Sequence, residues 1–372
     1  MLRVGIVGLG KMGLSHQSMI NAHPDVKLVA VCDSAAYVLD VISKYTGVKT
    51  YSDYKTMLAK EDLDCLFVAT PSRNHAAIVE AGLRRGLHVF CEKPFVLEPE
   101  TGFRLAELAE SKGLVNQVGY HCRFIGAFAE ARRLLKANII GELHHLRAEA
   151  YGPVVLRPQG STWRSQKSEG GGCLFDYACH AIDLINYLVG SPTSVSGSVF
   201  NSVFSNDVDD EIYSTLHFSD RFHGQLATNW SDESFRKMSI KLSLWGKNGR
   251  INVDRQEIQI YVRTLESPFE NLTQGWNVRY TTELTQPVWF YVRGEEYSAQ
   301  IDHFVQTVKT GGTSISNFRS ASEASLVAAM MRQDAAKSYT PVSLASEGEA
   351  SNGHVKPKVQ KSYMERVFGS RN

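Results

Sequence analysis

The apolar positions of the first 120 residues fall into short continuous runs that are separated by amphipathic stretches. Continuous apolar and β-branched runs are typical of strands that are covered on both faces. Because strands and helices alternate, this region predicts a parallel, doubly wound α/β sheet. The predicted strands are Val4–Val7, Leu28–Cys32, Cys65–Ala69, Val89–Cys91 and Leu114–Val118, and helices are predicted at Ala76–Arg85 and Pro99–Lys112, among others.

From about residue 124 the strands alternate between apolar and polar side chains. Runs of such strands together with helices predict an α+β domain with a large, mostly antiparallel open sheet. A glycine-rich turn, Gly170-Gly171-Gly172, precedes one of its helices. The predicted strands are Leu146–Ala150, Ile212–Phe218, Gly224–Trp230, Ser239–Trp245 and Ile258–Val262, and the predicted helices are Ala127–Leu135, Phe175–Val189, Ser298–Thr310 and Ala321–Lys337.

These patterns divide the chain into a first domain of residues 1–123 and a second of residues 124–345. A length of 372 residues also favours two domains over one. Residues 346–372 mix Ser, Gly, Glu, Lys and Pro, and we expect them to form a mobile tail.

Composition excludes several classes of function. Forty basic and thirty-nine acidic residues give a net charge of +1, so we expect no nucleic-acid partner. The six cysteines form no C-x-x-C pair, which favours reduced core thiols in a cytoplasmic protein, and we expect no metal. The first strand begins at Leu2, which leaves no room for a signal peptide, and no apolar run is long enough to cross a membrane.

A candidate dinucleotide site follows the first predicted strand. Gly8, Gly10 and Gly13, with Lys11 and Met12 between them, form a G-x-G-x-x-G turn that opens a helix. Such a Rossmann-type turn lets the backbone approach a pyrophosphate at the helix N-terminus. Lys11 either approaches the pyrophosphate or is solvated.

Asp33 ends the next predicted strand, twenty residues after Gly13, where a carboxylate accepts hydrogen bonds from the adenosine ribose. That carboxylate repels a 2′-phosphate, and Ser34-Ala35-Ala36 offers no cation to hold one, so NAD is favoured over NADP. The alternative is a glycine-rich turn beside an unrelated aspartate.

Candidate catalytic groups lie in two further segments. Lys93 follows the strand that ends at Cys91, at the edge where doubly wound sheets bind ligands, and Pro94 restricts its backbone. There it can exchange a proton with a bound hydroxyl. Asp176 and His180 are spaced i, i+4, which predicts one helix face, with Asp183 close to that face. The pair is either a proton relay or an ordinary helix-start aspartate and core histidine.

Together these motifs resemble the Gfo/Idh/MocA family of NAD(P)-dependent oxidoreductases from Met1 to about Leu344. The resemblance is carried by the glycine turn, by Thr70-Pro71 with His75, by Glu92-Lys93-Pro94, and by Gly171-Gly172 followed by Asp176 and by His180-Ala181-Ile182-Asp183.

The resemblance implies a role for each matching residue. Lys93 contacts the substrate hydroxyl, His180 is the acid/base and Asp176 orients the substrate or His180. Glu92 lies near the nicotinamide ribose. Thr70, Pro71 and His75 belong to the cofactor site.

The chemistry that follows is oxidation of a carbinol. A nicotinamide accepts the hydride while Lys93 or His180 takes the hydroxyl proton. We expect a nearby histidine cation and a partly dry cleft to lower the pKa of Lys93. Three weaker substrate candidates are Arg123, Trp163 and Arg164. Either arginine holds a phosphate or carboxylate of the substrate or forms a structural ion pair, and Trp163 either stacks on a sugar or belongs to a core or an interface.

Three functions fit this sequence. The first is an NAD-dependent dehydrogenase of a sugar, sugar derivative or cyclitol. The second is a glycosidase that uses NAD transiently. The third is a ligand-sensing regulator of the same fold, against which the joint presence of Lys93, Asp176 and His180 argues.

We also expect a homodimer or homotetramer, because the outer sheet face carries aromatic residues, for instance in Trp289-Phe290-Tyr291, and the family resemblance implies assembly through this sheet.

Overall fold

The fold is taken from a computed structural model, which describes residues 1–156, 163–219, 222–265 and 269–337. The predicted tail, 346–372, and the last part of the predicted second domain, 338–345, lie outside the described residues. The described residues form one compact unit that contains two sheets.

The first sheet is parallel and has the strand order β3-β2-β1-β4-β5-β6 within the described residues. The sheet is doubly wound, as predicted. Strands β2 and β3 lie on one side of β1 and strands β4 to β6 on the other, so the order in which strands are added reverses between β1 and β4. Ligands bind beyond the carboxyl ends of the strands at such a reversal. The strands are β1 (Leu2–Val7), β2 (Val26–Cys32), β3 (Lys49–Tyr51), β4 (Cys65–Val68), β5 (His88–Cys91) and β6 (Asn116–Val118).

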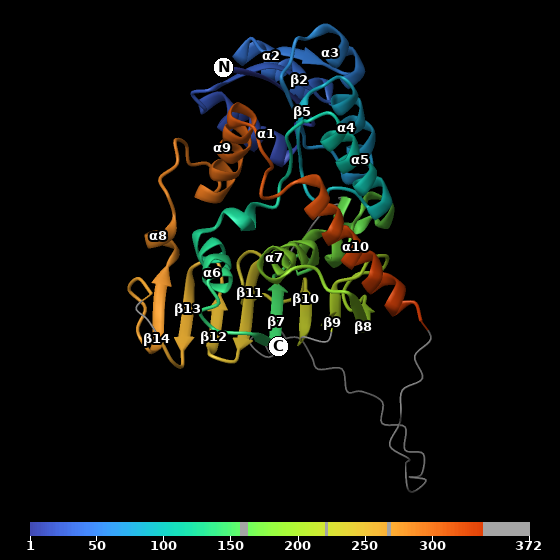
Figure 1. The fold of residues 1–372 in the computed structure, drawn as a ribbon. Coiled ribbons are helices and arrows are strands. Elements are labelled where there is room, and N and C mark those ends of the chain that lie inside the picture. Colours follow the sequence, from blue (N-terminus) through green and yellow to red (C-terminus); the bar gives the residue numbers. More distant parts are fainter. Residues whose placement is uncertain (157–162, 220–221, 266–268, 338–372) are drawn as a thin grey trace, which may run out of the picture. The chain divides into compact units, whose positions relative to one another are not determined.

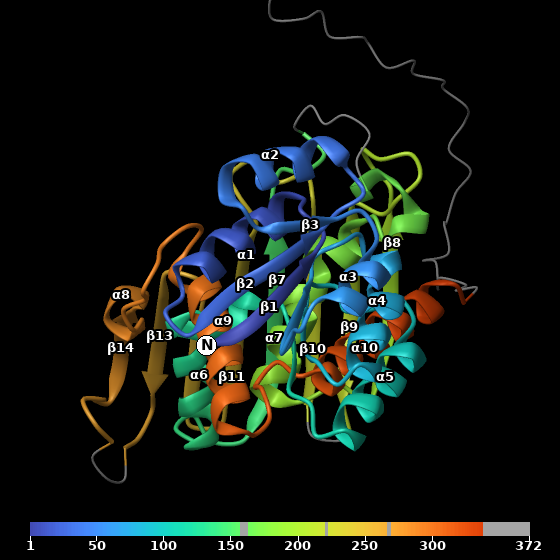
Figure 2. The ribbon, with the colours of Figure 1, turned by 90° about the horizontal axis from the view of Figure 1, so that it is seen from above.

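Helices cover both faces of the first sheet (Figure 2). One face packs on α1 (Lys11–Ala22), α2 (Ala36–Thr46) and α9 (Glu295–Thr310), and the other packs on α3 (Tyr54–Lys60), α4 (His75–Arg84) and α5 (Pro99–Ser111). Although α9 follows the second sheet in the chain, it belongs to the core of the first. The rings of Phe67 and Phe90 stack at 4.8 Å, and Phe304 of α9 meets Phe67 edge-on at 5.4 Å.

The second sheet has the order β14-β13-β12-β11-β7-β10-β9-β8 among the described residues. Its neighbouring strands are antiparallel except for β10 and β7, which are parallel. The prediction of a mostly antiparallel open sheet is therefore confirmed. The strands are β7 (Leu143–Tyr151), β8 (Ser194–Asn201), β9 (Glu211–Phe218), β10 (Phe222–Asn229), β11 (Ser239–Gly246), β12 (Gly249–Val253), β13 (Glu257–Val262) and β14 (Gly275–Tyr280).

Strand β8 was not predicted from the sequence, and the reason is physical. Its segment is rich in serine, and the register against β9 shifts between Ser196 and Val199. Gly197 in this irregularity has φ +62°, a left-handed conformation that suits glycine. Strict alternation is lost at such a bulge, so the period-two signal disappears from the sequence.

One face of the second sheet packs on α6 (Gly126–Lys136), α7 (Cys179–Val189) and α10 (Phe318–Ala335) (Figure 1). The predicted alternation holds in β9, where Ile212 and Leu216 are buried and Tyr213 is exposed. The short helix α8 (Thr281–Leu284) follows the sheet.

The opposite, outer face carries aromatic side chains that form a row across neighbouring strands. Trp245 of β11 lies opposite Arg250 of β12, Arg250 lies opposite Tyr261 of β13, and Tyr261 lies opposite Trp276 of β14. The guanidinium of Arg250 lies over the ring of Trp245 at 4.4 Å, and the rings of Tyr261 and Trp276 are 5.3 Å apart.

The aromatic example chosen from the sequence was wrong. Trp289 and Phe290 lie in the loop before α9 and pack against the first core, and the ring of Trp289 meets that of His23 at 4.5 Å. They precede α9, which packs on the first sheet, and so they do not line the outer face of the second sheet.

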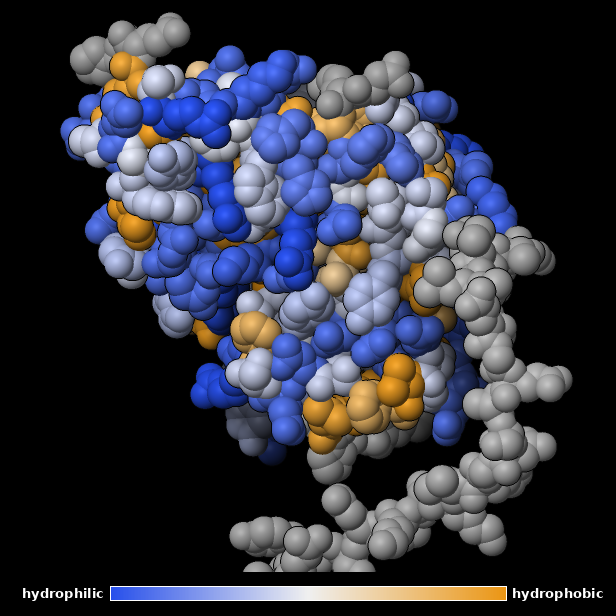
Figure 3. Space-filling model, turned by 90° about the horizontal axis from the view of Figure 1, so that it is seen from below, coloured by the Kyte–Doolittle hydropathy of each residue, from blue (hydrophilic) through white to orange (hydrophobic). Residues whose placement is uncertain are grey.

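The surface and the cysteines agree with the composition. On the face shown in Figure 3, apolar residues gather in small patches within a largely hydrophilic surface, as is usual for proteins. Within the described residues no helix is both long and apolar enough to span a membrane. All six cysteines are free and buried, as predicted.

Candidate active site

The glycine turn between β1 and α1 allows neighbouring backbone segments to pack closely against each other. Gly8 has φ +96°, and a Cβ there would lie 2.6 Å from the backbone of Ala69 on the neighbouring strand end. A Cβ on Gly13 would lie 1.9 Å from the oxygen of Gly8, whereas Gly10 faces open space. The first and third glycines thus allow tight packing, and the second leaves room for a ligand. Lys11 is exposed at the start of α1, and Met12 is half-buried.

Asp33 ties this turn to the end of β2. Its carboxylate accepts hydrogen bonds from the amides of Leu9, at 2.5 Å, and Ala35, at 2.8 Å. Asp33 therefore stands beside the turn, where the predicted contact with the adenosine ribose would be made. No side chain caps the N-terminus of α1, so its amides remain available for a phosphate.

His75 connects the loop after β4 with the loop after β5. Its Nδ1 lies 3.0 Å from the oxygen of Pro94, and its Nε2 lies 2.9 Å from the oxygen of Thr70. Burial lowers the pKa of His75. The side chain is therefore a brace between two loops of the cofactor edge. The hydroxyl of Thr70 is buried without a partner among the described residues, and Pro71 follows it.

Glu92 is buried against α1. Its carboxylate lies 2.7 Å from Nε2 of His16 and accepts a hydrogen bond from the amide of Lys93 at 3.2 Å. Burial opposes its charge, but His16 and Lys93 outweigh burial and lower the pKa of Glu92. A Cβ on Gly119 would lie 2.9 Å from this carboxylate, so a larger residue there would force the carboxylate to move. The sequence did not point to His16, because one histidine on a helix carries no motif.

Lys93, which follows β5 of the first sheet, forms an ion pair with Asp176, which precedes α7. Its ammonium donates to the backbone oxygen of Asp176 at 3.1 Å and to its carboxylate at 3.2 Å. The peptide bond between Lys93 and Pro94 is cis. Arg164 donates to the same carboxylate at 2.9 Å, so one aspartate holds two cations. The guanidinium of Arg164 also lies 5.0 Å from the ring of Trp163.

The expected lowering of the lysine pKa was wrong. Burial does lower it, but the negative charges of Asp176 and Glu92, with the hydrogen bond to Asp176, outweigh burial, and the pKa of Lys93 lies above its usual value. Asp176 is held ionised, because Lys93 and Arg164 overcome the effect of burial and lower its pKa. Lys93 is therefore an ammonium ion at neutral pH.

His180 is buried and carries no positive charge at neutral pH. Burial, with the charge of Lys93, lowers its pKa well below the usual value. Its Nδ1 has no partner in the described part of the chain. The expected regular helix over Phe175–Val189 begins instead with a π-helical turn, Leu174–Ala178, and Asp176 within it turns to Lys93 and Arg164.

His121 is a site residue that the sequence analysis did not single out. Its ring lies 5.0 Å from that of His180 and stacks on Tyr297 at 4.5 Å. Burial lowers the pKa of His121 to about 3. The only available signal was its position two residues before Arg123, because Tyr297 comes from α9, far along the chain.

The nitrogens of His121 and His180 and the sulfur of Cys122 all lie within 4.8 Å of one another. These are zinc-ligand types. However, burial and the charges of Lys93, Arg255 and Arg293 oppose a positive charge at His121, and together they outweigh Glu92, which favours one. We therefore assign no metal to this cluster.

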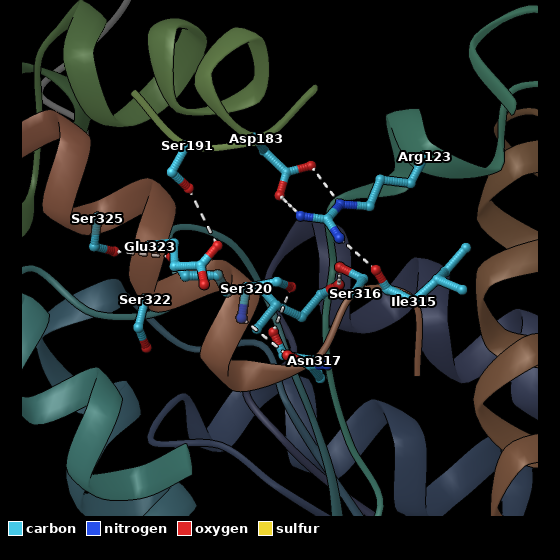
Figure 4. A network of polar contacts seen from close by, with 12 residues as sticks. Arg123, Asp183, Ser191, Ile315, Ser316, Asn317, Ser320, Ser322, Glu323 and Ser325 are labelled. Atoms are coloured by element: carbon cyan, nitrogen blue, oxygen red, sulfur yellow. Dashed lines mark hydrogen bonds and ion pairs between the residues drawn. The ribbon is translucent and has the colours of Figure 1, made fainter. Parts of the chain in front are cut away.

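Arg123 forms a structural ion pair (Figure 4). Its guanidinium donates to both carboxylate oxygens of Asp183 on α7, at 2.9 and 2.5 Å, and to the backbone oxygen of Ile315. Both charged side chains are at most 4% exposed. Of the two alternatives left by the sequence, the structure therefore shows the ion pair.

The described residues fit a bound dinucleotide. The cradle of Gly8 and Gly13, the uncapped start of α1, the carboxylate of Asp33 and the unpartnered hydroxyl of Thr70 lie along the carboxyl edge of the first sheet. Glu92 and Lys93 stand at the end of β5 on the same edge. This fold and this site define a nicotinamide-dependent oxidoreductase.

Comparison with known proteins identifies the family. A family profile described as "Oxidoreductase family, NAD-binding Rossmann fold" matches residues 2–120, and one described as "GFO/IDH/MocA C-terminal domain" matches residues 128–252. The chain belongs to the Gfo/Idh/MocA family of oxidoreductases, and its cofactor is NAD. The predicted family, fold class and cofactor are thus confirmed.

Individual relatives show how far this similarity extends. The chain is 26% identical over 322 residues to the scyllo-inositol 2-dehydrogenase (NAD(+)) of Bacillus subtilis, covering 84% of this chain and 88% of the relative. It is 27% identical over 263 residues to the 2,7-anhydro-N-acetylneuraminate hydratase of Escherichia coli, covering 69% and 68%. A solved levoglucosan dehydrogenase, in complex with NADH and levoglucosan, shares the fold with a TM-score of 0.78 at 23% identity, covering 90% and 97%.

Proposed function

We propose that this protein is an NAD-dependent dehydrogenase that oxidises a secondary hydroxyl of a sugar, a sugar derivative or a cyclitol. The observation that carries the proposal is the joint placement of a charged lysine and a neutral histidine whose Nδ1 has no hydrogen-bond partner among the described residues. Lys93 is anchored to Asp176, and its charge acts on His180. Lys93 follows β5 at the edge where doubly wound sheets hold their ligands, and the ring of His180 on α7 lies 5.9 Å from that of Tyr120, which follows β6. Residues 1–123 would bind the cofactor, and the following domain would supply the substrate side.

The two groups divide the proton chemistry between them. Bound NAD supplies the hydride acceptor. Lys93, as an ammonium ion, has no lone pair to accept a proton, so it donates a hydrogen bond to the substrate oxygen and stabilises the negative charge that develops there. His180 is neutral and takes the hydroxyl proton as general base. Asp176 positions Lys93, and Arg164 holds Asp176 from the other side.

Arg164 also has room for a role toward the substrate. Its side chain is 38% exposed, and its guanidinium adjoins Trp163. An arginine that is held by a carboxylate at one edge still has donors at the other. Trp163 and Arg164 remain our candidates for contacting a sugar ring and an acidic substituent.

A second candidate is a reaction that uses NAD transiently and consumes none. The E. coli relative named above is a hydratase, and addition or removal of water causes no net redox change. The measurement that separates the two is NADH absorbance during turnover. A dehydrogenase accumulates one NADH per product, whereas a transient mechanism converts its substrate without accumulation. A ligand-sensing regulator would do neither.

The test begins with polyols, uronates and nucleotide sugars screened for NADH formation. On the best substrate, Lys93→Met and His180→Ala should each lower kcat by ~10²–10⁴-fold while NAD affinity is nearly unchanged. Lys112→Met, in an exposed lysine at the end of α5, is the matched control and should keep full activity. Near-full turnover in both site variants would refute the assignment.

The pH profile then decides which group accepts the proton. A general base must be unprotonated, and the pKa of His180 is lowered, so kcat/KM should stay level from neutral pH down past the usual histidine range before it falls. If Lys93 were the acceptor, activity would instead rise with pH into the alkaline range where a lysine with a raised pKa loses its proton. That alkaline rise would assign the role to Lys93.

A further inference from the structure

Two histidines face each other on the outer face of the second sheet. His217 of β9 and His223 of β10 are directly opposite partners in an antiparallel pair. Their Nδ1 atoms are 2.9 Å apart, and the rings meet nearly at right angles, at 80°. His145 of β7 is the next partner of His223, so imidazoles occupy three adjacent strands. Neither the cofactor chemistry nor the proposed catalysis uses these residues.

The two Nδ1 atoms are at the distance of an N–H···N hydrogen bond, so in the metal-free chain one ring carries its proton on Nδ1 and donates it to the other. A metal that binds both nitrogens would take the place of this proton. With metal–nitrogen bonds of about 2.0–2.1 Å, a separation of 2.9 Å corresponds to an angle of about 90° at the metal. That is the angle between neighbouring ligands in the square-planar and octahedral geometries of Cu²⁺ and Ni²⁺. A tetrahedral zinc site would need the nitrogens about 3.3 Å apart.

A further side chain orients one of the rings. The Oγ of Ser196 on β8 lies 2.7 Å from Nε2 of His217. In the tautomer whose Nε2–H donates to Ser196, the Nδ1 lone pair of His217 faces His223. Metal-binding histidines almost always have their second nitrogen held in this way. His223 presents its own Nδ1 once its ring proton is on Nε2, so the site needs no proton released from a neutral pair.

We infer that His217 and His223 form a binding site for a divalent late transition metal, with Ni²⁺ or Cu²⁺ favoured over Zn²⁺. Imidazole ligands do not suit Mg²⁺ or Ca²⁺, so these ions should not compete. The rigid sheet fixes both side chains before the metal arrives. In the single chain His223 is exposed and His217 half-buried, so a metal can reach the pair, which lies on β9 and β10, away from the aromatic row on β11–β14 that is expected to face a second copy.

The test is calorimetric titration of the full-length protein, purified without a histidine tag, with Ni²⁺. The expected result is saturable binding of one Ni²⁺ per chain. His223→Gln and His217→Gln should abolish it, and Ser196→Ala should weaken it by ~10-fold or more. His144→Gln, in an exposed histidine of β7, is the matched control and should bind as the unmodified protein does.

Two results would overturn the inference. One is the absence of saturable Ni²⁺ binding by the unmodified protein. The other is binding that survives in both His217→Gln and His223→Gln, which would place the metal elsewhere. NAD binding, measured on each variant, verifies that the protein is folded, because the cofactor edge belongs to the other sheet.

Discussion

Replacing Arg123 with methionine should destabilise the protein without altering substrate binding. The side chain is 4% exposed and Asp183 is fully buried, so the substitution leaves a carboxylate in the interior with no cation beside it. Burial already raises the pKa of Asp183 while the arginine is present. Breaking such a buried pair from one side costs about 3–5 kcal/mol of unfolding free energy. The backbone oxygen of Ile315 loses a donor as well.

The assay compares three proteins by urea denaturation: the unmodified chain, Arg123→Met, and Arg123→Met combined with Asp183→Leu. The double variant removes both charges, and exchanging a buried ion pair for apolar side chains is often neutral or stabilising. We therefore expect it to recover most of the stability that the single variant loses. Under conditions where each protein is folded, KM for the substrate should agree among the three.

The opposite pattern would refute this reasoning. If Arg123→Met unfolds at the same urea concentration as the unmodified chain while KM rises, the guanidinium binds substrate and its pairing with Asp183 is incidental.

Three further predictions concern the cofactor, acid stability and assembly. NAD should bind more tightly than NADP, and Asp33→Ala should weaken NAD binding and reduce the preference for NAD over NADP. Fluorescence titration measures both affinities, and tighter binding of NADP to the unmodified protein would contradict this prediction. His121 has a pKa of about 3 in the fold against an ordinary 6.5, so the unfolded chain takes up the proton first as pH falls. Stability present above pH 6.5 should therefore be lost on acidification, by about 2 kcal/mol at about pH 5, and His121→Phe should flatten this dependence in denaturation series. We also propose that the outer face with Trp245, Tyr261 and Trp276 pairs with a second copy, so light scattering should give a dimer or tetramer, and a mass near 41.4 kDa would rule that out.

The sequence predicted those parts of the fold that depend on local pattern. Continuous apolar runs located the buried strands of the first sheet, and alternation located β9 and β10. The glycine turn was recognisable because its backbone geometry excludes other residues, as the contacts of Gly8 and Gly13 show. Strands β3, β8, β12 and β14 were missed, and the bulge at Gly197 explains the absence of β8 from the prediction.

The sequence could not predict what distant segments bring to the site. Lys93 was found from its position after a strand, but the direction of its pKa depends on Asp176, 83 positions away. The stack of His121 on Tyr297 joins residues 176 positions apart, and no short motif records such a contact. Arg123 left two interpretations open because its partners, Asp183 and Ile315, also come from remote segments.

The place of α9 has a consequence for how the protein is made. The first sheet is complete in sequence at Val118, yet Phe304 of α9 covers Phe67 and Phe90 in its core. At ~5–20 residues per second, a ribosome needs roughly 10–40 s to reach that helix after finishing β6. During this interval the nascent cofactor domain exposes aromatic surface that its own residues cannot cover. The core of the first sheet is therefore completed only after α9, which follows the second sheet in the chain, has been made, and a fragment that ends after β6 lacks the helix that covers Phe67 and Phe90.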